Sequence, residues 1–183
     1  MALFDQNTWY ILKHLHQSIA TQAAAYIEAG EHLQPMAYLI SPAGHMDRHT
    51  RMHVAEIATE FIETLMRHPM GEQLLSQYLS DALREGSAIQ LQIHQEHGIK
   101  ARYTLSVQET LLPAADSQHL TQPSPALMVL LRGKHFSLPI FHLICTNHLQ
   151  QRICQLRTFP DMAEIEAAQH LLQPYPYTTP TTH

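Results

Sequence analysis

The spacing of the apolar residues changes once along this chain of 183 residues. Before Gly86 the apolar residues recur every three or four positions, which places them along one side of an α-helix. Over 89–108 they alternate with polar residues, which is typical of β-strands that have one buried face. Because both patterns must share one core, the change predicts helices packed against an antiparallel sheet in an α+β fold.

The first half of the chain predicts three helices and one strand. Gly30 ends the first helix, since glycine readily adopts the left-handed conformation of a helix end. Ser41 followed by Pro42 is a helix-start signal, so we expect the second helix to begin there. The expected helices cover 5–29, 42–67 and 69–86, and the expected strand covers 36–40.

The second half predicts strands and one final helix. The alternating stretch 89–108 reads as a β-hairpin, and 110–125, which has three prolines and no periodicity, as a loop. Pro139 predicts a bulge or a sheet edge, because proline cannot donate a hydrogen bond to a neighbouring strand. The remaining expected strands cover 126–132, 136–146 and 151–159, and a helix follows Pro160.

These elements predict one domain. We expect a single α+β domain over 1–173, with helices packed on one face of a curved, mostly antiparallel sheet of five to six strands. Residues 174–183 are rich in proline and threonine and lack any core-forming pattern, so they are expected to be a flexible tail.

The composition excludes several classes of protein. The net charge is −5 at pH 7 and the 11 basic residues are scattered, so a nucleic-acid-binding surface is not expected. Two cysteines are too few for a secreted domain held by disulfides. No apolar run is long enough for a membrane span, and the first residues lack a signal-peptide pattern. We therefore expect a cytoplasmic protein with neither nucleic acid nor membrane as partner.

Histidine supplies much of the polarity of this chain, with 15 residues. His45, His49 and His53 are spaced four apart, and on the expected helix 42–67 they share one side with Glu56. Two imidazoles one helical turn apart and a nearby carboxylate are a ligand set for zinc or iron. In a chain so rich in histidine such spacings also arise by chance, and an ordinary helix face exposed to solvent is the favoured interpretation of the pattern.

The solvent face of the expected hairpin is a candidate partner-binding surface. It carries uncharged polar side chains, namely Gln90, Gln92, His94, Thr104 and Ser106. Depletion of charge is typical of the core of protein interfaces. The alternative is an ordinary sheet face that contacts only water.

No constellation for catalysis is recognisable in the sequence. His142 and Cys145 are three apart on one expected strand, so their side chains point to opposite faces of the sheet. Cys145 and Cys154 are expected to face each other across the last hairpin as small buried side chains. The six glycines form no phosphate-binding or dinucleotide-binding motif.

These observations favour a non-catalytic protein that binds another protein, as an adaptor, a secretion chaperone or an immunity-type protein, or that assembles with itself. One alternative is a metal-binding protein or metal-dependent enzyme that uses His49 and His53. A second alternative is a carrier that encloses a small apolar ligand between helices and sheet.

Overall fold

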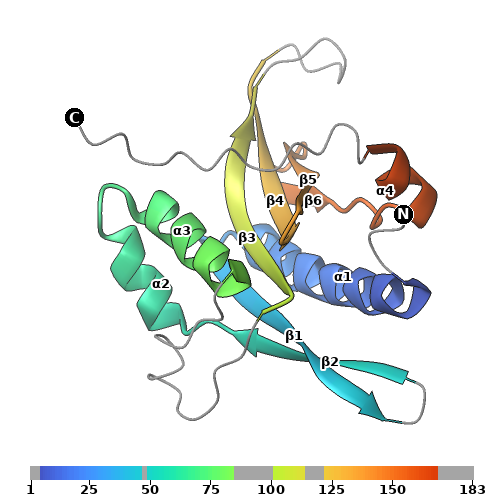
Figure 1. Cartoon of the computed structure of the whole chain (residues 1–183). Coiled ribbons are helices and arrows are strands. Elements are labelled where there is room, and N and C mark those ends of the chain that lie inside the picture. Colours follow the sequence, from blue (N-terminus) through green and yellow to red (C-terminus); the bar gives the residue numbers. More distant parts are fainter. Residues whose placement is uncertain (1–4, 47–48, 85–100, 114–121, 169–183) are drawn as a thin grey trace.

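The computed structural model of the chain describes residues 5–46, 49–84, 101–113 and 122–168. Its elements are α1 (Gln6–Glu28), β1 (Met36–Met46), β2 (His49–Glu56), α2 (Thr59–Met66), α3 (Gly71–Arg84), β3 (Tyr103–Leu112), β4 (Ser124–Gly133), β5 (Phe136–Thr146), β6 (Arg152–Gln155) and α4 (Met162–Ala168) (Figure 1). Over these ranges no helix has both the length and the apolar character needed to cross a membrane.

The six strands form one antiparallel sheet in the order β2-β1-β3-β4-β5-β6. The sheet is strongly curled (Figure 1). The Arg152 guanidinium of β6 reaches the Glu109 carboxylate of β3 at 2.5 Å, although β4 and β5 lie between these strands in the sheet. The α+β class and the curved antiparallel sheet predicted from the sequence are therefore confirmed.

Helix α1 ends where Gly30 predicts, and the structure adds a side-chain cap at its start. The Asp5 carboxylate accepts a hydrogen bond from the Thr8 backbone N–H at 2.7 Å and so caps the first turn. At the other end Gly30 has a φ of 77°, and the Glu31 N–H donates back to the Tyr26 carbonyl. The buried side of α1 is formed by Leu12, His16, Ile19, Ala20, Ala23, Ala24 and Ile27, together with Thr8.

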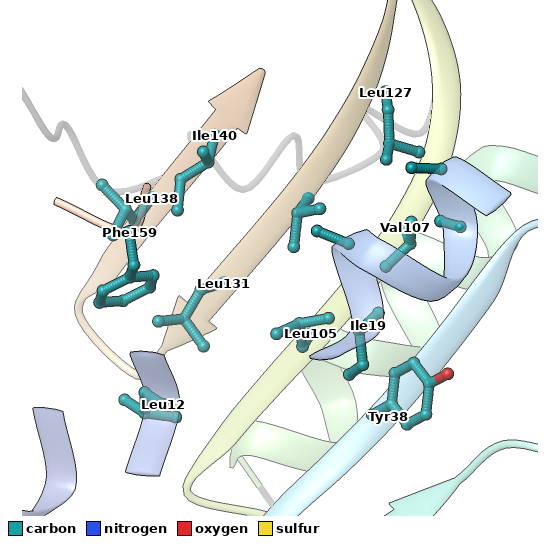
Figure 2. Close-up of a cluster of buried hydrophobic side chains, with 14 of the residues drawn as sticks. Leu12, Ile19, Tyr38, Leu105, Val107, Leu127, Leu131, Leu138, Ile140 and Phe159 are labelled. Atoms are coloured by element: carbon teal, nitrogen blue, oxygen red, sulfur yellow. The ribbon is translucent and has the colours of Figure 1, made fainter. Parts of the chain in front are cut away.

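Helices cover both faces of the sheet, whereas we expected them on one face only. Tyr38 and Ile40 of β1 belong to the core beneath α1, and Figure 2 shows Tyr38 there near Ile19. The alternate residues Ala37 and Leu39 belong to a second core formed with α2 and α3. Because side chains alternate along a strand, these two cores lie on opposite faces of β1.

The expected helix over 42–67 is wrong in its first half. Residues 36–56 form a hairpin of β1 and β2, with Tyr38 opposite Glu56 and Ser41 opposite His53. Helix α2 begins only at Thr59. Helical spacing does hold from Ile57 onward, but the pairing of β1 with β2 overrides the Ser41-Pro42 start signal, which lies on β1.

The expected hairpin over 89–108 is also wrong for the part that the structure describes. Tyr103–Val107 pairs with β1 on one side and with β4 on the other, so it has no edge left for 89–94. Residues 85–100, which include the rest of that hairpin, lie outside the described residues. The two neighbours of β3 in the sheet are β1 and β4.

Strand β5 has the bounds predicted from the sequence, whereas β6 is shorter than the strand predicted there. Phe136–Thr146 has the expected bounds, whereas the strand expected over 151–159 is paired only at Arg152–Gln155. β6 faces only the last four residues of β5, so Pro139 lies where β5 forms the edge of the sheet. The edge interpretation of Pro139 is confirmed.

Candidate functional site

The four predicted metal ligands lie on the hairpin of β1 and β2 instead of on a helix. His45 is on β1, and His49, His53 and Glu56 are on β2, with Met46 opposite His49. The shared helical side on which the prediction depended does not exist. His53 and Glu56 are an odd number of residues apart, so on the strand their side chains point to opposite faces.

The described residues include no cluster of three or more His, Cys, Asp or Glu side chains that could hold a metal ion. Metal binding through these histidines stays a prediction, as does the carriage of an apolar ligand.

The predicted partner-binding residues divide into two groups. Gln90, Gln92 and His94 lie outside the described residues. Thr104 and Ser106 are on β3, but Thr104 is only 1% exposed, opposite Arg132 of β4. Arg132 donates hydrogen bonds to Ser76 of α3, so this helix covers the face that we expected to be solvated.

The two cysteines do not face each other. Cys145 lies opposite Ile153 and Cys154 lies opposite Ile144, which places the two thiols on opposite faces of the sheet. The expectation that they meet across the last hairpin is therefore wrong. Burial, together with the nearby Glu28 carboxylate, raises the pKa of the Cys154 thiol to about 11, so this thiol stays protonated at neutral pH.

Two histidines form the most unusual polar cluster in the described core. His16 of α1 is 1% exposed and His142 of β5 is 0% exposed, and their ring centroids are 5.2 Å apart. The His142 Nδ1 atom accepts a hydrogen bond from the Arg157 backbone N–H at 2.8 Å. The other three ring nitrogens of the pair have no hydrogen-bond partner. Buried polar atoms without partners are uncommon, and they often mark a functional feature.

Both imidazoles are neutral at pH 7. Burial lowers the pKa of His16 to about 4, and His142 adds a smaller effect in the same direction. Burial likewise lowers the pKa of His142 to about 4, with a further contribution from the positive charge of Arg157. Because its Nδ1 accepts a hydrogen bond, neutral His142 carries its proton on Nε2.

The sequence does not single out this pair, although its pattern indicates the burial of each histidine separately. His16 falls among the apolar positions of α1, between Leu12 and Ile19. His142 has the same strand parity as Ile140 and Ile144, which are buried. Only the contact between α1 and β5 brings the two rings together.

Residues 156–168, which we call the C-terminal strap, follow β6 and include α4. The Arg157 N–H bonds to the His142 ring, and the Trp9 indole Nε1 of α1 donates to the Pro160 carbonyl at 3.1 Å. Figure 1 shows α4 close to the N-terminal end of α1. Backbone groups of the strap therefore bond to side chains of β5 and α1, and not to the backbone of a neighbouring strand.

Apolar side chains of the strap complete the core beneath α1. Phe159 is 6% exposed, and its ring centroid is 5.3 Å from that of His16. Figure 2 shows Phe159 beside Leu138 and Leu131 of the sheet. Ile165 of α4 is buried in the same core. The imidazole pair therefore lies directly under the strap.

The two edges of the sheet differ in how their backbone groups are used. At β6 the Cys154 N–H donates to the Glu28 carboxylate of α1 at 3.3 Å, so a side chain occupies that edge donor. At β2 the Ile57 N–H donates to the Ala37 carbonyl of β1. Hydrogen bonds alternate along antiparallel strands, so the N–H and C=O groups of Met52, Val54 and Glu56 face away from β1.

No described strand lies beside that outer edge of β2, because β2 ends the strand order. The Val54 side chain on it is 43% exposed. Comparison with known proteins finds no matching family model, no matching curated protein and no matching solved structure. The function must therefore be argued from these local features.

Proposed function

We propose that this protein is a non-catalytic binding module that takes an extended strand onto the outer edge of β2, and that a second copy of the chain supplies this strand. The outward backbone groups of β2 are the observation that carries the proposal. Unpaired strand edges are templates for pairing with another chain, and many proteins bind their partners in this way.

The sequence of β2 suits pairing with itself around a two-fold axis. The outward groups belong to Met52, Val54 and Glu56, so the axis falls on Val54. In this register Met52 lies opposite the partner's Glu56, and His53 lies opposite the partner's Ala55. The two Glu56 carboxylates are then four residues apart along the strands, roughly 13 Å, so like charges do not meet.

A proline at the axis tests the proposal. The Val54 N–H is outside the β1 ladder, so Val54→Pro removes an outward donor while leaving the bonds to β1 in place. Val54→Ala is the matched control, since it shortens the side chain and keeps the donor. We expect light scattering to give twice the chain mass of 20.9 kDa for the wild type and Val54→Ala, and a monomer for Val54→Pro.

Cysteine cross-linking tests the register, with Cys145→Ser as the background. Val54→Cys places two thiols at the axis, where directly opposite Cα atoms are about 5.5 Å apart and a disulfide can form. Glu56→Cys places them too far apart to bridge. A wild-type protein that is monomeric at every concentration, or equal cross-linking at both positions, would refute this proposal.

A further inference from the structure

We propose that His16 and His142 form an acid-sensitive latch, and that protonation of these imidazoles releases the C-terminal strap from α1 and β5. The inference depends on the buried cluster alone and not on strand addition at β2. It begins with the hydrogen bond from the Arg157 N–H to the His142 Nδ1 atom. Neutral His142 has its proton on Nε2, so a second proton must go to Nδ1, where the Arg157 N–H already points.

Protonation therefore turns an acceptor into a donor that faces another donor. The strap loses its bond to β5 and cannot replace it, because a charged imidazolium has no acceptor atom. The same proton places a charge at a position that is 0% exposed. Burial of an unpaired charge costs several kcal/mol, which favours movement of the strap and entry of water.

The surrounding groups do not neutralise that charge. The ionisable groups near His142 are His16 from α1, Arg157 from the strap, and Glu109 of β3, which lies in the same cross-strand row. Arg157 carries a positive charge, and the Glu109 carboxylate is already bonded to Arg152 of β6. At the start of α4, the Glu164 carboxylate accepts a hydrogen bond from the Asp161 backbone N–H, and the Asp161 carboxylate accepts one from the Glu164 backbone N–H.

The released state is favoured more steeply as the pH falls. Its imidazoles are solvated and have ordinary pKa values near 6.5, while burial in the closed state lowers both to about 4. Between these values the ratio of released to closed strap rises about tenfold per pH unit for each imidazole, and about hundredfold for both.

The sole tryptophan of the chain reports on the latch without an added probe. Trp9 donates its indole N–H to Pro160 of the strap, so release exposes the indole to water. We expect the emission of wild-type protein to shift to longer wavelength as the pH falls from about 6.5 to 4, while the far-UV circular dichroism is unchanged. The protection factor of the Arg157 amide, which is the ratio of its intrinsic to its observed hydrogen-exchange rate, should fall over the same range.

Two substitutions isolate the imidazoles. His142→Asn keeps an acceptor close to the position of Nδ1 and cannot be protonated, and His16→Leu removes a ring that has no hydrogen bond. We expect the double variant to show no shift in Trp9 emission. His148→Asn is the matched control, because this exposed histidine in the turn before β6 should leave the wild-type shift intact.

Two outcomes would overturn the latch. One is an equal Trp9 shift in the wild type and the double variant. The other is loss of circular dichroism in parallel with that shift, since the whole domain would then be unfolding. Should the double variant fail to fold, His16→Leu alone decides: it should halve the pH slope of the logarithm of the Arg157 protection factor, and an unchanged slope contradicts the proposal.

Discussion

The buried imidazole pair predicts how strongly the stability of the whole domain depends on pH. Unfolding exposes His16 and His142 to water, so their pKa values return from about 4 to about 6.5. Between these values the unfolded state binds more protons than the folded state, so the free energy of unfolding must fall as the pH is lowered. Above about pH 6.5 both states bind few protons, and this contribution disappears.

The size of the effect follows from the two shifts. One pKa unit corresponds to about 1.4 kcal/mol, so lowering the pH from about 7 to 5 should cost about 2 kcal/mol per imidazole and about 4 kcal/mol for the pair. This is a large part of the stability of an ordinary domain. Urea unfolding at both pH values measures it, with the His16→Leu, His142→Asn double variant as reference.

Comparison of the wild type with the double variant cancels the contributions of the ionisable groups that the two proteins share. We expect the wild type to lose about 4 kcal/mol more than the double variant between these pH values. A difference below about 1 kcal/mol, with the Trp9 emission showing the strap still closed at pH 5, would refute the reasoning. Release of the strap before unfolding would reduce the difference, because the released imidazoles bind protons in the folded protein as well.

Three smaller predictions follow from other buried positions. Gly71→Ala should cost about 1–3 kcal/mol in urea unfolding, because a Cβ atom there would overlap the backbone carbonyl of Leu65; a neutral result would show that α3 can shift. Thr104→Val should raise stability by about 1 kcal/mol, since the buried hydroxyl has no hydrogen-bond partner, and destabilisation would contradict this. At neutral pH iodoacetamide should modify half-buried Cys145 before Cys154, whose pKa is about 11; equal rates by mass spectrometry would count against the assignment.

The sequence predicted correctly those helices and strands whose bounds depend on residues within a short segment of the chain. Helix α1 ends just before Gly30, as predicted, and β5 has the predicted bounds 136–146, so both were readable from short segments. The β1–β2 hairpin was not readable, because Ser41-Pro42 is a valid helix start and only the pairing of β1 with β2 decides against it.

The candidate site shows the same division. The burial of His142 follows from its strand parity, and that of His16 from its place between apolar helical positions. Their contact depends on how α1 crosses the sheet, which no short segment specifies. The predicted metal ligands do not share the expected helical side because His49, His53 and Glu56 lie on a strand, where the odd spacing of His53 and Glu56 places these two side chains on opposite faces.

The carboxylate of Glu28 gives the sheet one closed end. Antiparallel sheets grow into filaments when each chain offers two different open edges, because a head-to-tail contact leaves a fresh edge for the next chain. Here the outward N–H of Cys154 on β6 is already bonded to Glu28, so this donor is not available to another chain. Under the proposed pairing through β2, an acidic side chain of α1 thus disfavours head-to-tail growth of the sheet from its other end.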